Sequence, residues 1–203
     1  MDCTRCPNLC ASRTQIVQPD LPEFGRTCRL LVIGEAPGAD EDREGKGFVG
    51  RAGRTLHQIL EEQGLRRGYD YGCANIVRCR PLGNRKPTHA EIESCLPFLA
   101  ETILQARPQA LLLVSDIPTG MIGGGGSLAY RIHQLRQYRW NIMPGMAHRL
   151  LQPAFQEYRP KVFPIPHTSP LAWNRNAPDG RKWSEIGQEV IRDLGVFLSL
   201  APS

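Results

Sequence analysis

The sequence predicts an α/β fold in which a mostly parallel four-stranded sheet lies between two layers of helices. Short apolar runs of the kind found in buried strands alternate along the chain with amphipathic stretches at helical spacing. Strands that alternate with helices form parallel sheets that are covered on both faces, because each crossover helix packs back on the sheet. The side chains suited to catalysis also follow the strands, where ligands bind in such folds.

Four short apolar runs are predicted to form the strands. The first ends at a glycine and leads into a loop rich in glycine and acidic residues. The predicted strands are residues 29–34, 73–77, 110–114 and 162–165.

Apolar residues at helical spacing predict a helix after the first strand, another after the second, and a closing helix near the C-terminus. Gly64 ends the first of these helices. Thr88 and Glu91 form a capping box at the start of the second, and Pro97 is expected to kink that helix or to delay its regular part. The apolar positions are Leu56, Ile59 and Leu60 in the first helix, Ile92, Leu96, Leu99 and Ile103 in the second, and Ile186, Val190, Leu194 and Phe197 in the last. The glycine run 123–126 is expected to be a loop insertion.

Length and composition place the chain among ordinary globular proteins. Its 203 residues suffice for a buried core, and we expect a single domain over residues 1–203. No apolar run approaches the ~20 residues of a membrane span, so we expect no membrane association. The N-terminus is polar and does not resemble a signal peptide, which favours the cytoplasm, including the nucleoid of a bacterium. A net charge of +5 is compatible with binding nucleic acid but is common in other proteins.

Seven cysteines are many for a chain expected in a reducing compartment. An odd number argues against a disulfide framework and favours metal ligation. Cys3 and Cys6 form a C-x2-C pair, and Cys79 and Cys95 lie far downstream. Four thiolates hold either a [4Fe–4S] cluster or a structural zinc ion, and the spacing does not choose between them. The remaining cysteines, expected to be small buried packing residues, are Cys10, Cys28 and Cys73.

Polar side chains suited to catalysis accompany three of the predicted strands. Glu35 comes directly after the first strand, Asn75 lies in the second, and His167 follows the fourth. Because ligands bind beyond the carboxyl ends of parallel strands, we expect these side chains to line one pocket. Each also has a more common role, as an acidic loop residue, an asparagine that caps a loop, or a hydrogen-bonded loop histidine.

Several motifs, in the right order, resemble the family 4 uracil-DNA glycosylases. They are G-E-A-P-G at residues 34–38, E-D at 41–42, G-K-G-F-V-G-R-A-G at 45–53 and N-I-V-R-C-R-P at 75–81, followed by Asn84, Arg85 and Cys95. The N-terminal C-T-R-C-P-N-L-C at 3–10 is similar to the segment that holds the metal cluster in that family. Together these motifs cover about half of the chain, which makes the resemblance more specific than any one motif.

The resemblance implies a four-stranded parallel sheet between helices and a [4Fe–4S] cluster held by Cys3, Cys6, Cys79 and Cys95. Residues 1–28 would form the cluster-binding segment, and the cluster would be structural. The resemblance also implies that the protein removes uracil from single- or double-stranded DNA without cleaving the strand. Free uracil would be the product, and the protein would act as a monomer.

The resemblance assigns roles to three side chains. Asn75 would recognise uracil, because one amide donates to uracil O4 and accepts from N3–H, a pairing that cytosine cannot match. Phe48 would stack on the extruded base, although a lone phenylalanine is more often a core residue. His167 would donate a hydrogen bond to uracil O2 and stabilise the departing anion.

Two glutamates are candidates for the acidic catalytic residue. Glu35 and Glu41 each suit the orientation of the attacking water or the stabilisation of an oxocarbenium ion. Family 1 enzymes carry an aspartate where this chain has Ala36, so the sequence leaves open which glutamate takes over and whether Glu35 mainly shapes the pocket. For Glu41, a solvated loop charge is an equal alternative. The residues of this motif expected to line the substrate pocket are Gly34, Ala36, Pro37 and Gly38.

Further residues are expected around the pocket. The run H-T-S-P-L at 167–171 is similar to the H-P-S-P-L loop of family 1, which makes Ser169 a substrate-binding candidate and Leu171 a wedge that fills the gap left by the extruded nucleotide. Asn84 is expected to support the site. Basic residues on nearby loops are candidates for phosphate contacts, with plain surface charge as the alternative. They are Arg51, Arg78, Arg80, Arg85 and Lys86, and farther away Arg131, Arg136 and Arg139 with Trp140.

Departures from the family pattern point to a divergent branch. Thr168 replaces a proline, Ser115 and Asp116 replace leucine-glycine, and the runs 123–126 and 173–176 are atypical. Two alternatives follow: a glycosylase of the same fold for another deaminated base such as hypoxanthine or xanthine, and a non-catalytic metal-bearing nucleic-acid-binding protein. Covalent DNA trapping, found in one branch of the superfamily, is not expected. Residues 81–87 read P-L-G-N-R-K-P and lack the basic, histidine-containing insertion of that branch.

Overall fold

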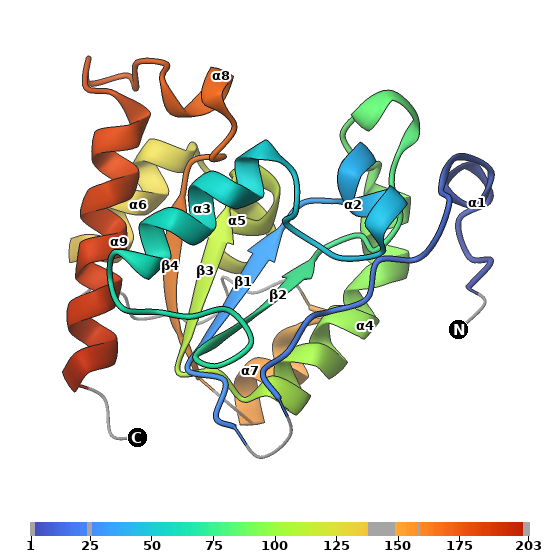
Figure 1. Cartoon of the computed structure of the whole chain (residues 1–203), viewed down its shortest axis with the longest axis horizontal. Coiled ribbons are helices and arrows are strands. Elements are labelled where there is room, and N and C mark those ends of the chain that lie inside the picture. The colour runs from blue at the N-terminus through green and yellow to red at the C-terminus, as the bar shows by residue number, and fades with distance from the viewer. Residues whose placement is uncertain (1–2, 24–25, 138–148, 158, 201–203) are drawn as a thin grey trace.

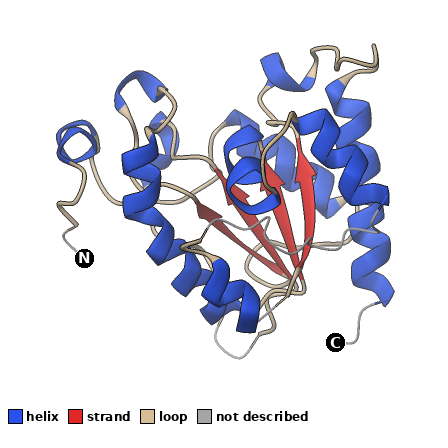
Figure 2. Cartoon of the chain, turned by 180° about the vertical axis from the view of Figure 1, so that it is seen from behind, coloured by secondary structure: helices blue, strands red, loops and turns tan. Residues whose placement is uncertain are grey.

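The computed structural model describes residues 3–23, 26–137, 149–157 and 159–200. In this part of the chain four strands form one sheet in the order β2-β1-β3-β4, and every neighbouring pair is parallel. Figure 2 shows the sheet enclosed by helices. The strands are β1 (Leu30–Gly34), β2 (Tyr71–Asn75), β3 (Ala110–Val114) and β4 (Lys161–Ile165). The predicted α/β/α fold with a parallel four-stranded sheet is confirmed.

Right-handed crossovers decide which face each long helix covers. The chain moves from β1 to β2 in one direction across the sheet and from β2 to β3 and β4 in the other, so the connecting helices fall on opposite faces. In Figure 1, α3 and α9 lie in front of the sheet, and α5 and α6 lie behind it. The long helices of the front layer are α3 (Arg51–Glu61) and α9 (Trp183–Leu200), and the other helices of the two layers are α4 (His89–Ala106), α5 (Asp116–Gly123), α6 (Leu128–Gln137) and α7 (Gln152–Glu157).

Short helices follow three of the four strands. They are α2 (Ala39–Glu44) after β1, the 3-10 helix η1 (Leu82–Asn84) after β2, and α8 (Pro170–Trp173) after β4. All three lie at the upper end of the molecule in Figure 1, beyond the carboxyl ends of the strands. The loops that position ligands in parallel sheets are therefore gathered at one end of this molecule.

The second strand begins and ends earlier than the sequence predicts. It spans Tyr71–Asn75, paired from Leu30↔Tyr71 to Gly34↔Asn75, whereas the prediction was 73–77. Ile76 and Val77 are fully buried, so their apolar character extends the hydrophobic run past the end of the strand. The predicted end of this strand was therefore wrong, because buried apolar residues that follow the strand were counted as part of it.

The helix α4 follows its predicted capping box and buried face. Thr88 Oγ1 accepts from the Glu91 amide at 3.3 Å, and the Glu91 carboxylate accepts from the Thr88 amide at 2.8 Å. Helix α4 is continuous through Pro97, which contradicts the expected delay of its regular part. The buried positions include Ile92, Leu96, Leu99 and Ile103, so packing of this face holds the helix together despite the amide that proline lacks.

The glycine run forms a short loop except at its first residue, which belongs to a helix. Gly123 is the last residue of α5, and only a short connection separates it from α6, which begins at Leu128. Gly124 and Gly126 have φ angles of 87° and 113°, which residues other than glycine rarely adopt. The glycines therefore serve a tight turn between two helices that contact each other.

The N-terminal segment protects the free edge of the sheet. Asp20 exchanges two backbone hydrogen bonds with Cys73 of β2, at 2.8 and 2.7 Å, and the Val17 amide donates to Arg78 O. An added Cβ on Gly72 would lie 2.6 Å from Asp20 O, so the two segments pack closely. This segment leads from α1 (Pro7–Ser12), which lies at the right-hand side of Figure 1.

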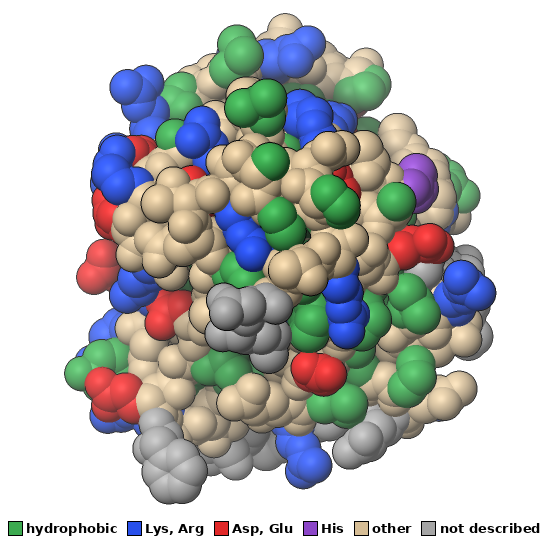
Figure 3. All heavy atoms as spheres, turned by 90° about the vertical axis from the view of Figure 1, so that its right-hand side faces the viewer, with side chains coloured by type: hydrophobic (Ala, Val, Ile, Leu, Met, Phe, Trp, Pro, Cys, Tyr) green, Lys and Arg blue, Asp and Glu red, His purple; other side chains and the backbone are tan. Residues whose placement is uncertain are grey.

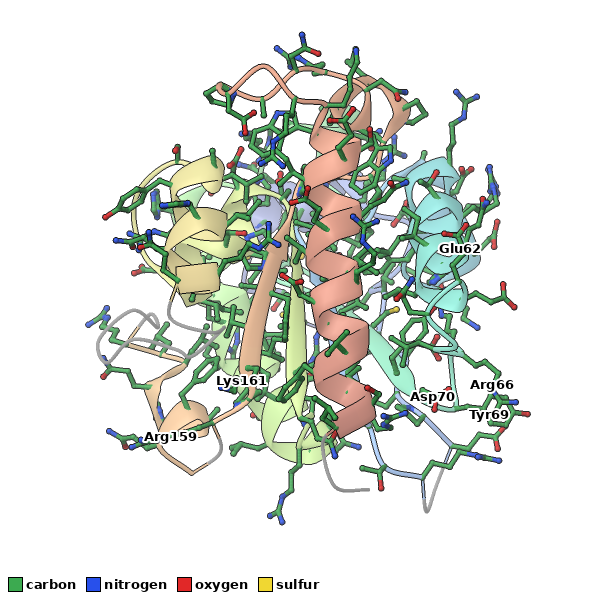
Figure 4. All side chains as sticks on the ribbon, turned by 90° about the vertical axis from the view of Figure 1, so that its left-hand side faces the viewer. Glu62, Arg66, Tyr69, Asp70, Arg159 and Lys161 are labelled. Carbon is green, nitrogen blue, oxygen red and sulfur yellow. The ribbon has the colours of Figure 1, made fainter. Side chains whose placement is uncertain are left out.

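The opposite end of the molecule carries an arginine–tyrosine stack. Arg26 and Arg66 lie over the exposed ring of Tyr69, 4.2 and 4.8 Å from its centre. Figure 4 shows Arg66, Tyr69 and Asp70 together at the lower end of the molecule, away from the loops that follow the strands. None of the described helices is both long and apolar enough to span a membrane.

Candidate active site

A cavity of about 440 Å³ opens at the carboxyl end of the sheet. The connections after β1 and β3 run to opposite faces, and the crevice between two such strands is where parallel sheets bind ligands. The cavity is lined by residues 34–41 after β1, Asn75 at the end of β2, Val114 at the end of β3, and His167 and Thr168 after β4. The structure thus brings Glu35, Asn75 and His167 together, as the sequence predicts.

Two candidate uracil-binding side chains meet beside Gly34. A Cβ added to Gly34 would lie 2.4 Å from Asn75 Oδ1 and 2.7 Å from Phe48 Cζ, so glycine is required for both side chains to keep their places. Asn75 is only 8% exposed, and no described group hydrogen-bonds its side-chain amide. The amide and the phenylalanine ring are therefore available to one bound ligand.

The backbone of Phe48 is in the left-handed region, with φ of 58°. This conformation costs a residue other than glycine about 1 kcal/mol, so it needs support from its surroundings. A Cβ on Gly53 would lie 2.1 Å from Phe48 O, which shows that the first turn of α3 packs directly on this backbone. His57 Nε2 lies 2.9 Å from the same carbonyl oxygen.

A partly buried polar network behind Phe48 supplies that support. Arg67 donates to Gly47 O at 2.6 Å and to the Asp20 carboxylate at 2.7 Å. His57 Nδ1 lies 2.7 Å from the Tyr71 hydroxyl. Burial lowers the pKa of His57, and the nearby Arg67 cation lowers it further, so the imidazole is neutral. Nothing in the sequence singles out Arg67 and His57, because their partners are distant in the chain.

The two candidate glutamates have different hydrogen-bond partners in the structure. Both carboxylate oxygens of Glu41 accept backbone N–H groups, from Gly38 at 3.1 Å and from Gly50 at 2.7 Å. Glu41 therefore ties the loop after β1 to the loop before α3, and its role with water stays a prediction. Glu35, which also lines the cavity, has no such pair of backbone bonds and is the freer carboxylate.

Glu35 lies half-buried beside polar neighbours. The Ser115 hydroxyl donates to Glu35 Oε2 at 3.4 Å, a long hydrogen bond. Burial raises the pKa of Glu35, Asp116 adds to the rise, and Lys86 and the Ser115 hydroxyl oppose it. Ser115 is buried with φ of 94° and ψ of 178°, a region that is nearly confined to glycine. The departure from the family at Ser115 and Asp116 therefore adjoins the candidate acid.

The hydrogen bonds of His167 identify its tautomer. The Ser169 amide donates to His167 Nδ1 at 3.1 Å, so a neutral ring carries its proton on Nε2. Packing around the ring lowers the pKa of His167 although the residue as a whole is exposed, and the Glu41 carboxylate only partly offsets this effect. His167 is thus neutral, and its Nε2–H is a donor at the cavity wall.

Thr168 replaces the family's proline with a hydrogen bond. Its side chain is 1% exposed, and its hydroxyl donates to Ala52 O at 2.8 Å. This bond ties the loop after β4 to the first turn of α3. The loop after β4 is therefore held in place by a side-chain hydrogen bond.

The remaining substrate-binding candidates fall into two groups. Ala36, Pro37, Gly38 and Asn84 line the cavity. Asn84 also accepts a hydrogen bond from Arg80 Nε at 2.8 Å. Ser169 and Leu171 do not line it: Ser169 precedes α8, and Leu171 projects from that helix with 79% of its surface exposed.

The basic candidates differ in their availability to phosphates. Arg51 is exposed at the cavity rim. Arg78 is half-buried and donates to Phe98 O and Thr102 Oγ1 at 2.8 and 2.9 Å. It is therefore a packing residue under α4, and its prediction as a phosphate contact is corrected. Arg136 pairs with Glu189 and Asp193 of α9, at 2.7 and 3.1 Å. Arg139 and Trp140 lie outside the described residues.

The candidate cluster cysteines lie close enough to influence one another. Burial raises the pKa of Cys95 to about 11, and the sulfurs of Cys79, Cys6 and Cys3 contribute to that rise. Arg13 joins two of these residues, donating to Cys79 Sγ at 3.0 Å and to Cys3 O at 2.8 Å. Within the described residues no three potential ligands stand in the arrangement of a closed metal site.

The other cysteines are in two environments. Cys28 and Cys73 are buried packing residues, as predicted. Cys10 is only partly buried, and its thiol donates to Cys3 O at 3.4 Å, so it belongs to the group around the cluster segment and not to the core.

A second cavity of about 540 Å³ adjoins the first, and His167 lines both. Ser115, Asp116 and Trp183 form part of its wall. The sequence did not indicate this cavity, because its walls come from α5, α6 and the segment after α8.

Comparison with known proteins decides the family. The family model of the uracil-DNA glycosylase superfamily matches residues 21–194. The chain belongs to the uracil-DNA glycosylase superfamily. It is 42% identical over 192 residues to a type-4 uracil-DNA glycosylase of Thermotoga maritima, a match that covers 95% of this chain and 85% of that protein.

Other superfamily members named type-4 uracil-DNA glycosylase are also similar. That of Saccharolobus solfataricus is 34% identical over 184 residues, covering 89% of this chain and 76% of the relative. That of Pyrobaculum aerophilum is 45% identical over 88 residues, and this match spans 43% of this chain and 44% of the relative. The family resemblance inferred from the motifs is confirmed.

Proposed function

We propose that this protein is a type-4 uracil-DNA glycosylase that hydrolyses the N-glycosidic bond of uracil in DNA and leaves an abasic site. One observation carries the proposal: the Phe48 ring and the Asn75 amide converge beside Gly34 in a cavity that His167 also lines. A stacking surface, a pyrimidine-reading amide and a hydrogen-bond donor for the leaving group are the parts that uracil excision needs.

Asn75 selects the base. Its Nδ2–H donates to uracil O4 and its Oδ1 accepts from N3–H, whereas cytosine presents the opposite pattern at both positions. Because the amide is buried, a mismatched base would leave polar groups unpaired, which costs more than a weak contact. Phe48 stacks on the base from a backbone that is held in place before the substrate arrives.

His167 and Glu35 stabilise the two charges of the transition state. His167 donates Nε2–H to uracil O2 as negative charge develops on the leaving base, and its neutral state avoids loss of the proton to the product. Glu35, ionised, stabilises positive charge on the sugar or orients the attacking water. Glu41 holds the loop that carries Glu35.

We further propose that Cys3, Cys6, Cys79 and Cys95 hold a [4Fe–4S] cluster. The donor set suits it, since all four ligands are soft sulfurs and two of them have nearby donors: Arg13 to Cys79 and the Arg78 amide to Cys95. When bound, the cluster would supply a structural link and no step of the hydrolysis. Cys3 and Cys6 come from the N-terminal segment and Cys79 and Cys95 from the body of the fold, so ligation would join the two.

Release of uracil from an oligonucleotide tests the proposal. Anaerobically purified protein is incubated with single- and double-stranded oligonucleotides that carry uracil, hypoxanthine or xanthine, and abasic sites are read as alkali-labile cleavage. We expect cleavage at uracil alone. Equal cleavage at hypoxanthine or xanthine would favour the alternative base specificity, to which Ser115 and Asp116 beside Glu35 point. Salt-dependent DNA binding without any cleavage would favour the non-catalytic alternative.

Asn75→Asp provides the residue-level test. The carboxylate cannot donate to uracil O4 and repels the departing anion, so we expect uracil release to fall about a hundredfold or more. Asn8→Asp, an exposed position on α1, is the matched control and should retain full activity. Full activity of Asn75→Asp, with an unchanged melting temperature, would exclude the assigned role.

A further inference from the structure

The loop 81–87 between β2 and α4 borders the active-site cavity. Pro81, Asn84 and Arg85 contribute to the cavity wall. In Figure 1 this loop, in light green, rises beside α2 at the upper end of the molecule. It therefore lies where DNA must pass when a nucleotide enters the cavity.

The conformation of this loop is fixed by its own hydrogen bonds. Gly83 and Asn84 are both in the left-handed region, with φ of 63° and 55°, and Asn84 Oδ1 accepts from Arg80 Nε at 2.8 Å. Arg85 makes two hydrogen bonds to the Glu91 carboxylate, at 2.9 and 2.7 Å. That pairing lowers the pKa of Glu91 to about 2. The loop is thus rigid before DNA binds.

At the tip of this rigid loop stands a solvent-exposed leucine. Leu82 is 76% exposed, while Pro81 and Pro87 on either side are buried. Single exposed leucines are common on protein surfaces, so the position of Leu82, and not its exposure alone, carries the argument. This one is held by a strained turn, and residues 76–90 contain no acidic side chain. Its basic neighbours along the chain are Arg80, Arg85 and Lys86, of which Arg85 is paired with Glu91.

A second exposed leucine lies across the cavity. Leu171 of α8 is 79% exposed, and α8 is held against α9, because a Cβ on Gly187 would lie 2.4 Å from the Trp173 ring. The loop with Leu82 follows β2 and α8 follows β4, the two edge strands of the sheet. Three strand spacings of about 4.8 Å separate these edges, on the order of 14 Å. Figure 1 shows the two elements rising on opposite sides of the strand ends.

We propose that Leu82 is a second wedge: in duplex DNA it packs against the base stack on the flank of the extruded nucleotide opposite to Leu171. Arg80 and Lys86 would contact the adjoining phosphates. The inference rests on the proposed uracil-DNA glycosylase function and deepens it. In the space-filling view of the α1 side, hydrophobic and basic side chains alternate along the upper rim, as a surface that contacts both bases and phosphates requires (Figure 3).

The proposed wedge should affect uracil release mainly from double-stranded DNA. Extrusion of a nucleotide from a duplex breaks pairing and stacking, and an apolar side chain inserted at the step compensates for both. A uracil in a single strand has no pairing to lose. Leu82 should therefore determine how well the protein works on double-stranded DNA and have little influence on single strands.

Single-turnover uracil release measures this difference. For Leu82→Ala we expect about a tenfold loss of rate on a duplex with a U·A pair and less than about a twofold change on the same strand alone. Leu82→Met, which stays apolar, should restore most of the duplex rate. The control Leu200→Ala removes a leucine that is 80% exposed at the end of α9, and it should change neither rate.

The fluorescence of a base analogue measures unstacking by Leu82 without requiring uracil release. 2-Aminopurine placed next to the uracil brightens when the step is unstacked, and we expect this signal to be strong with the wild type and weak with Leu82→Ala. Wild-type duplex activity and fluorescence in Leu82→Ala, or equal losses on single and double strands, would overturn the proposal. If the wild type releases no uracil from either substrate, the proposed function fails. In that case fluorescence still decides the wedge, and a wild-type signal that does not depend on Leu82 would overturn it.

Discussion

At the scale of single residues, the cavity shifts the pKa values of Glu35 and His167 in opposite directions. Burial raises the pKa of Glu35, and packing around the ring lowers that of His167. The shifts favour the neutral form of each, since charge is costly away from water. For His167 the neutral ring is the useful form, because Ser169 directs its proton to Nε2. For Glu35 the ionised form is the useful one, so the reaction requires a pH above its raised pKa.

The pH dependence of the rate follows from these directions. As pH falls through the raised pKa of Glu35, the carboxylate is lost, so kcat should decline at a pH higher than that of an ordinary glutamate, about 4.3. The pKa of His167 lies below its ordinary value of about 6.5, and a protonated ring still donates from Nε2, so an acid limb that Glu35→Gln removes is assigned to Glu35. Measuring kcat between about pH 4 and 8 for the wild type and Glu35→Gln tests this. The variant should be slower and lack the acid limb, and an identical acid limb in both proteins would contradict the assignment.

At the scale of elements, the loops around the cavity are held by side chains from distant parts of the chain. Thr168 ties the loop after β4 to α3, Glu41 ties two loops together, and Arg67 holds the carbonyl of Gly47. These bonds fix the left-handed backbone of Phe48 before any ligand binds. The stacking surface is therefore preorganised, which lowers the ordering cost of substrate binding.

Arg67→Met tests this support. The change leaves the buried Gly47 carbonyl without its partner, and it leaves the partly exposed Asp20 carboxylate with Lys46 at 3.7 Å as its remaining described partner. An unpaired buried polar group costs about 1–3 kcal/mol. We expect the free energy of unfolding to fall by about 2 kcal/mol and KM for uracil-DNA to rise more than kcat falls. Arg66→Met, at the neighbouring exposed position, is the control and should match the wild type in urea unfolding and in KM. A rise in KM for both variants would point to general DNA electrostatics instead.

At the scale of the whole molecule, the four cysteines proposed as cluster ligands come from two separate parts of the chain. The N-terminal segment carries Cys3 and Cys6 and also pairs with the edge strand β2, whereas Cys95 lies in α4. The loop 81–87 with Leu82 lies between Cys79 and Cys95. Ligation of both cysteines would therefore fix the ends of the segment that carries the proposed second wedge.

Replacement of a ligand tests the cluster. Cys79→Ser should lose the visible absorption of a [4Fe–4S] cluster and most of its iron, about four atoms per chain in the intact protein. It should also unfold at a lower temperature, because the N-terminal segment is released. Cys10→Ser, in the same segment, is the control and should keep both iron and stability. Zinc in place of iron in the purified wild type would support the structural-zinc alternative.

The sequence by itself determined the fold class, the family and the residues at the strand ends. Periodic apolar runs report burial in a sheet and on helix faces, and three of the predicted strands lie within a residue of the observed ones. The motifs placed Glu35, Phe48, Asn75 and His167 in one cavity, since the ends of parallel strands meet at one edge. The sequence misplaced β2, where burial and strand geometry do not coincide.

Only the tertiary structure decided which polar groups are free to act. It engages both oxygens of Glu41 with backbone amides and leaves Glu35 in the cavity, and it turns Arg78 inward under α4. It also supplies the supports that no motif records, those of Arg67 and Thr168. The physical reason is that hydrogen bonds join groups close in space, whatever their separation in the chain, and sequence patterns record only local spacing.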